Sequence, residues 1–263
     1  MSLTAMAAAG SSRDDAGSEK ALAPAHDAFY SGRYKDAAAL AVARTVEDSA
    51  DIAAYELHMA AILFEVKRLL GDEASGRKKV SECEPCPALL ATFDQLTNST
   101  RTLARARIES DPADHAARFL LGKINLNYVW LNLGPLGRRK GLGEYREARK
   151  ALKEVLEQEP QHVRAIVAYA WIDYIVDTRV PFGVKWILGG GSRKRALGAM
   201  RTAVTIDTDY FSNVEARFGL WEMLIREKDL TGAEVVARDL AREFPANQEL
   251  ARFLAGRVTA AEE

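Results

Sequence analysis

The chain has 263 residues, of which 48% are hydrophobic and 28% are charged, and its formal net charge is −1. This balance is that of an ordinary globular protein, and it excludes a globally basic nucleic-acid binder. Two cysteines are too few for a disulfide-rich scaffold, and no apolar run approaches the roughly 20 residues that cross a bilayer. Composition leaves both an enzyme and a binding module open.

The first stretch, residues 1–20, is rich in Ala, Ser, Gly and Asp and has almost nothing to bury, which predicts a disordered segment. Its Ala7-Ala8-Ala9 run resembles the small-residue tail of a signal peptide whose apolar part is missing. A flexible native N-terminus is the alternative interpretation.

From Ala21 onward, apolar residues recur at helical spacing, and there is little strand-like alternation. The predicted helices are separated by Gly and Pro, as at Asp111-Pro112 and Glu159-Pro160. The clearest periodic segments are Ile52–Leu70, His115–Leu131, Val163–Ile175 and Ala216–Leu224. A series of helix pairs without strands predicts a bundle or a solenoid.

A 48-residue repeat favours the solenoid. Pro112, Pro160 and Thr208 follow one another at this interval, each after an acidic residue. The same shift places Gly141 on Gly189 and Ala148 on Ala196. Two neighbouring segments therefore share one plan.

These segments resemble the tetratricopeptide repeat, in which small residues let helices A and B pack closely and an Asp-Pro ends each unit. The residues that carry the resemblance are Gly32, Tyr34, Ala37, Ala41, Tyr55, Gly122, Ala148, Ala170, Ala196, Ala203, Gly219, Ala233, Ala237 and Phe244-Pro245. It implies an all-α solenoid over 21–258 with about five helix pairs, and Asn247 to Val258 as a capping helix.

Three units carry insertions between their helices, and the longest, in the second unit, lies between Met59 and Thr100. In the first unit, the small residue of helix A and the first Ala of helix B are Ala25 and Ala37. The same two positions are more than twice as far apart in the third and fourth units, from Gly122 to Ala148 and from Ala170 to Ala196. Insertions at one turn type emerge on one edge of a solenoid, so we expect them side by side, as an ordered ledge or as longer helices.

The insertions in the third and fourth units are both basic. Gly134 to Lys153 holds seven basic and two acidic residues, and Lys185 to Arg201 holds five basic and no acidic ones. We call their basic residues the basic edge: Arg138, Arg139, Lys140, Lys185, Arg193, Lys194 and Arg195. We expect the two clusters to be neighbours in space.

Four interpretations of the basic edge remain open. Its apolar residues, such as Phe182 and Trp186, would extend the core while the cations face water. Alternatively, the edge would bind an anionic protein or peptide, or touch an anionic membrane surface. Phosphate binding by Gly189-Gly190-Gly191-Ser192 is a further alternative, although the P-loop spacing is missing.

Cys83 and Cys86 are separated by two residues, with no second such pair and no nearby His to complete a zinc site. Free thiols in a reducing compartment and a loop disulfide in an oxidising one remain as alternatives. The Ala-rich N-terminus favours the disulfide.

No motif indicates catalysis, a metal or a cofactor. The histidines, His26, His58, His115 and His162, are scattered over different repeats, without the partners of a nucleophilic triad. We therefore expect a non-enzymatic protein.

Tetratricopeptide proteins bind extended peptides on the face lined by helices A. The residues that this resemblance places there are Phe119, Lys123, Asn127, Trp171 and Tyr174. Aromatic anchors beside an amide and a Lys suit a peptide groove. In the alternative interpretation, Trp171 and Tyr174 pack against a neighbouring helix.

The predicted function is that of a binding scaffold for a protein or peptide, in a bacterial envelope or secretory assembly. A periplasmic or secreted location is expected, with the cytoplasm as the alternative. The rival function is that of a periplasmic small-molecule carrier associated with an uptake system, in which the concave face closes into an apolar cavity.

Overall fold

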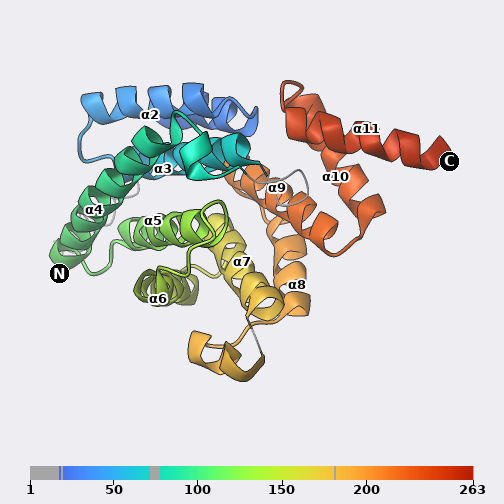
Figure 1. Cartoon of the computed structure of the whole chain (residues 1–263). Helices are drawn as coiled ribbons and strands as arrows, with labels where there is room; N and C mark the ends of the chain where they lie inside the picture. Colours follow the sequence, from blue (N-terminus) through green and yellow to red (C-terminus); the bar gives the residue numbers. More distant parts are fainter. Residues whose placement is uncertain (1–17, 19, 72–77, 181, 263) are drawn as a thin grey trace. The chain divides into compact units, whose positions relative to one another are not determined.

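The computed structural model describes residues 18, 20–71, 78–180 and 182–262, and every regular element in them is a helix (Figure 1). The all-α prediction is thus confirmed. A helix over residues 20–30 is followed by α2 (Tyr34–Glu47), α3 (Ile52–Leu70), η1 (Val80–Glu82), α4 (Cys86–Ser110), α5 (His115–Leu133), α6 (Leu142–Gln158), α7 (Val163–Arg179), η2 (Phe182–Leu188), α8 (Arg193–Ala203), α9 (Tyr210–Arg226), α10 (Leu230–Glu243) and α11 (Gln248–Glu262). The predicted disordered segment lies, apart from Ser18 and Lys20, outside the described residues.

The chain divides into two compact units. Unit 1 comprises the described residues of Met1–Phe29 and Arg33–Ala151, and unit 2 comprises Tyr30–Gly32 and the described residues of Leu152–Glu263. The boundary falls within α6, so the first part of this helix belongs to unit 1 and the rest to unit 2.

In unit 1 the helices pack as consecutive pairs through small residues. Ala28 on the first helix, Ala37 on α2 and Ala61 on α3 form one fully buried cluster. Alanine has no side chain beyond Cβ, so helices that meet through it approach closely. α3 contacts its neighbours α2 and α4 and also α5, the next helix A of the repeat.

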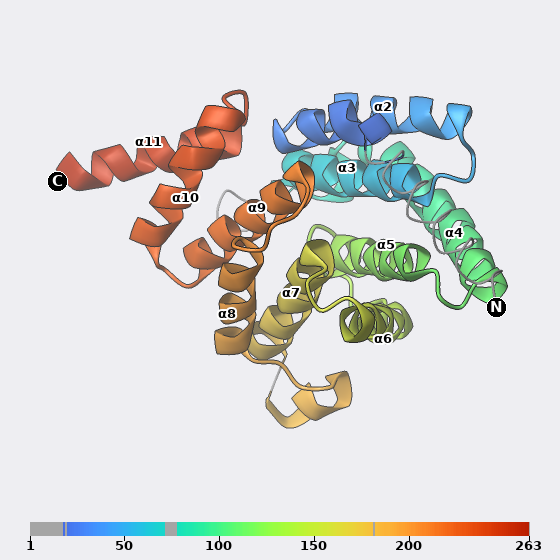
Figure 2. The same ribbon diagram turned by 180° about the vertical axis from the view of Figure 1, so that it is seen from behind.

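Unit 2 follows the same plan. α7 packs on α8 and α9 packs on α10, and α7 and α9 also contact each other (Figures 1 and 2). Ala196 on α8 and Ala233 and Ala237 on α10 are buried at the positions that the repeat predicts. On α9, a Cβ added to Gly219 would lie 3.0 Å from the sulfur of Met200, so the glycine makes room for α8.

The insertions become both longer helices and ordered loops. α5 has 19 residues and α6 has 17, against 14 in α2. The loops before α6 and α8 share a backbone feature, because Gly141 and Gly189 are both left-handed, with φ of 99° and 80°. The glycine match at the 48-residue interval therefore reflects two positions that both need a left-handed backbone.

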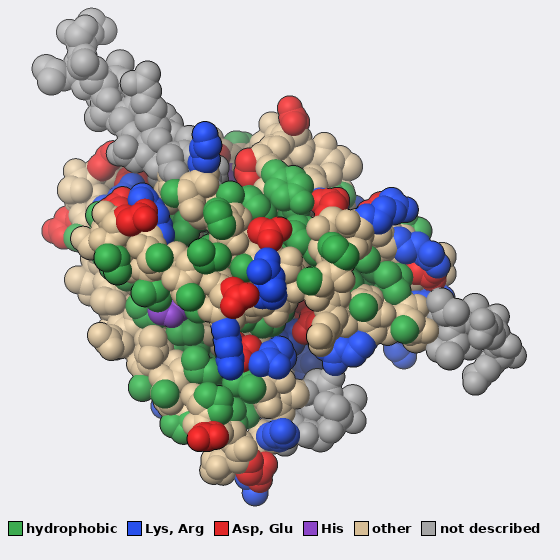
Figure 3. Space-filling view, turned by 90° about the horizontal axis from the view of Figure 1, so that it is seen from above, with side chains coloured by type: hydrophobic (Ala, Val, Ile, Leu, Met, Phe, Trp, Pro, Cys, Tyr) green, Lys and Arg blue, Asp and Glu red, His purple; other side chains and the backbone are tan. Residues whose placement is uncertain are grey.

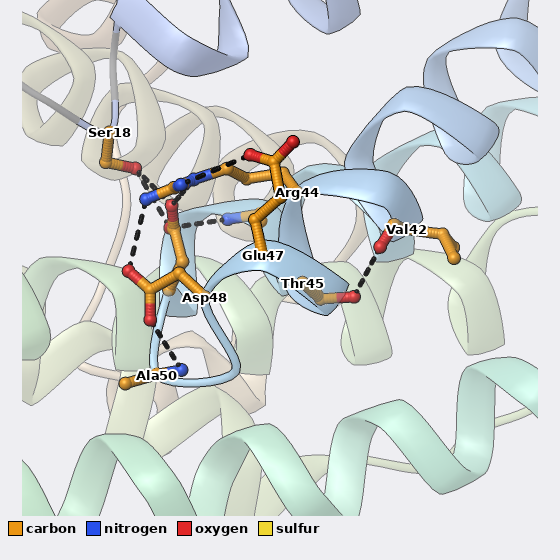
Figure 4. Close-up of polar contacts among 9 residues, drawn as sticks. Ser18, Val42, Arg44, Thr45, Glu47, Asp48 and Ala50 are labelled. Atoms are coloured by element: carbon orange, nitrogen blue, oxygen red, sulfur yellow. Dashed lines mark hydrogen bonds and ion pairs between the residues drawn. The ribbon is translucent and has the colours of Figure 1, made fainter.

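The turn from helix B to the next helix A is held by hydrogen bonds of charged side chains. After α2, Arg44 Nε donates to Asp51 Oδ2 at 2.8 Å and Arg44 Nη2 donates to Asp48 Oδ2 at 3.1 Å. Asp48 Oδ1 accepts from the backbone of Ala50, as Figure 4 shows. Asp51 Oδ1 in turn accepts from the backbone N–H of Ala54 and caps α3.

The same arrangement of an arginine and a capping aspartate recurs after α4. Arg107 donates twice to Asp114 Oδ2, at 2.9 and 2.6 Å, and Asp114 Oδ1 caps α5 by accepting from Ala117 N at 2.7 Å. Asp111 accepts from the backbone of Ala113, as Asp48 does from that of Ala50. The sequence separation between the arginine and the capping carboxylate is the same in both turns, so one local sequence builds both junctions.

We predict that Asp114→Ala lowers the free energy of unfolding by about 1–2 kcal/mol, because it removes the helix cap and the partner of Arg107. Asp114→Asn keeps a cap acceptor and loses only the charge, so it costs less than Asp114→Ala. Urea denaturation measures both variants. Equal losses would show that the cap contributes nothing.

His162 is the exception among these caps. Its Nδ1 accepts a hydrogen bond from Ala165 N at 3.2 Å, so the capping atom must be unprotonated. Burial lowers the pKa of His162, and Arg164 acts in the same direction, against the opposing carboxylates of Glu159 and Glu215. The folded state therefore favours the neutral ring, and stability is lost as the pH falls through the unfolded-state pKa of about 6.5.

We predict that His162→Asn becomes progressively more stable than the unsubstituted protein as the pH is lowered from about 7.5 to about 5.5, because an amide caps the helix without titrating. The comparison is made by urea denaturation at both pH values. A stability difference that is the same at both pH values would contradict this role of His162. His58, whose pKa is also lowered by burial, is retained in both proteins and cancels in the comparison.

Candidate functional site

The five predicted groove residues are divided between the two units. Phe119, Lys123 and Asn127 lie on α5 in unit 1, and Trp171 and Tyr174 lie on α7 in unit 2. The two sets are therefore described separately.

In unit 1 the groove residues mostly serve internal packing. Phe119 and Asn127 are buried, and Lys123 is partly exposed. Asn127 Nδ2 donates at 2.9 Å to Oε1 of Glu56, which is itself buried on α3. A buried carboxylate requires such a partner. The amide predicted to meet a peptide is thus used to join two successive helices A.

In unit 2 the two aromatic residues have different roles. Tyr174 is 3% exposed, and its hydroxyl donates to Oε1 of Glu227 at 2.7 Å. Burial, with the adjacent carboxylate, raises the pKa of Tyr174 to about 12. Trp171 is partly exposed, and its ring meets the Tyr174 ring edge-on with 5.7 Å between the ring centres. The Arg226 guanidinium lies 5.5 Å from the centre of the Trp171 ring.

The second cluster of the basic edge is paired with acids from other helices. Lys185 contacts Asp177 at 2.7 Å and Arg195 contacts Asp173 at 2.6 Å. Arg193 contacts Glu227 at 3.4 Å. Counting charges inside the insertion missed these carboxylates, because they belong to α7 and follow α9 in the chain.

Asp177 fastens both ends of this insertion. Lys185 Nζ donates to the backbone oxygen and to Oδ1 of Asp177, both at 2.7 Å. The backbone N–H of Arg193 donates to Oδ2 of Asp177 at 2.9 Å. The hydrogen bonds from Lys185 and Arg193 lower the pKa of Asp177. Nearby, a Cβ on Gly191 would lie 2.5 Å from the Asp173 carbonyl, so only glycine fits against α7. This close approach explains Gly191, whereas Gly189 and Gly190 adopt positive φ angles of 80° and 71°.

The first cluster of the basic edge differs from the second. Arg138, Arg139 and Lys140 are exposed and form no ion pair with any residue that the structure describes. This cluster lies in unit 1 and the other in unit 2. The expected closeness of the two clusters therefore stays a prediction.

A polar contact joins helices A and B at equivalent positions of the two repeats. Asn125 Nδ2 donates to Glu147 at 2.8 Å in unit 1, and Arg195 Nε donates to Asp173 at 2.8 Å in unit 2. The 48-residue interval relates Asn125 to Asp173 and Glu147 to Arg195. Applying this interval to polar residues, as well as to Gly and Ala, would have found the second pair.

Cys83 and Cys86 form a disulfide between η1 and the start of α4. Both sulfur-bearing residues are buried. Within the described part of the chain, no group of His, Cys, Asp and Glu is arranged to hold a metal ion.

Among the described helices, none combines the length and the apolar character needed to cross a membrane. The sequence matches no model of a known protein family, and a search of curated proteins found no match. The tetratricopeptide resemblance thus stays a prediction, alongside the confirmed all-α fold.

We predict that Arg195→Ala lowers the free energy of unfolding by about 1–2 kcal/mol, because the buried carboxylate of Asp173 would lose its ion pair with Arg195. The loss stays below the about 3–5 kcal/mol of a fully buried pair because the Arg195 side chain is 63% exposed. Lys194→Ala is the matched control, since Lys194 is exposed, has no ion pair among the described residues, and should change stability by less than about 0.5 kcal/mol. Urea denaturation compares the two variants, and equal effects would refute the structural role of the pair.

Proposed function

We propose that this chain is a non-enzymatic scaffold that binds a protein or peptide partner, in the manner of tetratricopeptide proteins. The observation that carries the proposal is the partly exposed Trp171 with Arg226 above its ring, on two successive helices A of unit 2. Trp and Arg are the residues most often found at the centre of binding interfaces.

The surroundings of Trp171 suit an interaction surface held in one conformation. Tyr174 supports the indole from the side, and its own hydroxyl is fixed by Glu227. Arg226 is held by Glu222 at 2.6 Å. Side chains that are already ordered lose less conformational entropy when a partner binds.

The disulfide supports a periplasmic or secreted location for the scaffold, because disulfides persist in oxidising compartments. In such a location, the protein would belong to a bacterial envelope or secretory assembly.

The proposal is tested by placing a photo-crosslinking amino acid at residue 175, which is partly exposed one helical turn after Trp171 on α7, in the living cell that expresses the protein. We expect a discrete covalent adduct with one partner, and Trp171→Ala should reduce its yield about tenfold or more. Residue 235 is the control position, because Val235 is 62% exposed on α10 in the same unit and lies outside the proposed surface.

Equal adducts from residues 175 and 235, or none from residue 175, would contradict the proposal. Native mass spectrometry of the purified protein provides a second measurement. A small molecule that co-purifies reproducibly would favour the carrier over the scaffold.

A further inference from the structure

Ion pairing accounts for most arginine side chains that the structure describes. Their carboxylate partners come from the same helix or from a neighbouring one, and acidic and basic side chains lie beside each other at several places on the face in Figure 3. Arginines paired in this way include Arg44, Arg68, Arg105, Arg107, Arg164, Arg195, Arg217, Arg238 and Arg257.

One group of cations departs from this pattern. Arg138, Arg139 and Lys140 lie on the loop between α5 and α6, and Arg146 lies in the second turn of α6. All four side chains are exposed, and none forms an ion pair with a described residue. We call these four residues the unpaired basic cluster.

The acids nearest in sequence are already engaged by other helices. Glu144 contacts Arg101 of α4 at 3.4 Å. Glu147 accepts two hydrogen bonds from Arg105 of α4, at 3.0 and 2.7 Å, and one from Asn125 of α5. Both carboxylates therefore balance cations on α4 and leave the unpaired basic cluster without counter-charge.

The loop that carries the cluster has a defined backbone. The N–H of Arg138 donates to the carbonyl of Asn132 at 2.6 Å, and the N–H of Leu136 donates to that of Leu131 at 3.1 Å. At the other end of the loop, Gly141 lies against α5, where an added Cβ would be 3.0 Å from Val129. The cations therefore extend from a loop whose backbone is held against α5.

Exposed leucines flank the same loop. Leu133, the last residue of α5, is 46% exposed, and Leu142, the first residue of α6, is 50% exposed. The equivalent insertion in unit 2 also exposes apolar side chains, with Trp186 at 77% and Ile187 at 44%, and ends close to the exposed Lys194. Apolar side chains beside cations are thus a shared property of both insertions.

We propose that the loop between α5 and α6 docks this protein on an anionic lipid bilayer, through the unpaired basic cluster together with Leu133 and Leu142. Arg and Lys side chains are attracted to anionic headgroups, and each strengthens binding about fivefold when it lies near the surface. The leucines reach the boundary between headgroups and acyl chains. A bilayer surface satisfies both kinds of side chain at once, because its headgroups are anionic and its acyl chains are apolar.

Sedimentation with lipid vesicles tests the proposal. The probes are vesicles of roughly one part phosphatidylglycerol to two parts phosphatidylcholine, and vesicles of phosphatidylcholine alone. We expect binding to the anionic vesicles at about 50 mM salt and little binding to the neutral ones. Binding should be lost at about 0.5 M salt, where the Debye length is only about 4 Å and charges are strongly screened.

The triple variant Arg138→Ala, Arg139→Ala, Lys140→Ala should bind the anionic vesicles about a hundredfold more weakly. Its matched control removes three exposed cations on other helices, as Lys35→Ala, Arg242→Ala, Arg252→Ala, and should change binding less than about twofold. Far-UV circular dichroism confirms that both triple variants keep their helices.

The leucines distinguish a bilayer from a purely electrostatic partner. Leu142→Ser should weaken vesicle binding about fivefold or more and leave binding to polyglutamate unchanged. Val46→Ser, at a side chain that is 82% exposed on α2, is the control. Binding to polyglutamate with no binding to anionic vesicles would overturn the proposal in favour of an acidic protein partner. Equal losses in the two triple variants would overturn it as well.

Discussion

The arrangement of helices depends on the side chain that caps the start of each helix A, and this side chain is a carboxylate at α3 and α5. Asp51 and Asp114 satisfy backbone N–H groups at the start of a helix and at the same time hold an arginine from the preceding helix. One side chain therefore fixes both where helix A begins and how helix B approaches it. Helices that pack through alanine tolerate little variation in the distance and angle between them, because short side chains cannot rearrange to fill a gap.

Charge pairing between helices then determines which cations are available to solvent. In unit 2, acids of α7 neutralise Lys185 and Arg195 and hold the insertion close to that helix. In unit 1, Glu147 faces Arg105 and Asn125 on α4 and α5, so the cations that precede α6 have no counter-charge. Two insertions with the same local charge thus present different surfaces.

The candidate site could be predicted only in part. Helical periodicity correctly placed Trp171 and Tyr174 on one helix A, because both follow from spacing along a single helix. It could not show that Tyr174 is buried against Glu227, or that Asn127 pairs with Glu56, since these partners are 53 and 71 residues away. Partners at such distances are decided by packing.

The sequence by itself determined the helical class, the helix ends at Gly and Pro, the 48-residue interval and the small residues through which helices pack. These features depend on interactions within a few turns of one helix, or on a pattern that repeats along the chain. Only the tertiary structure decided which charges are neutralised, which polar groups are buried and whether Cys83 pairs with Cys86. Each of these depends on distances between side chains that the order of residues does not specify.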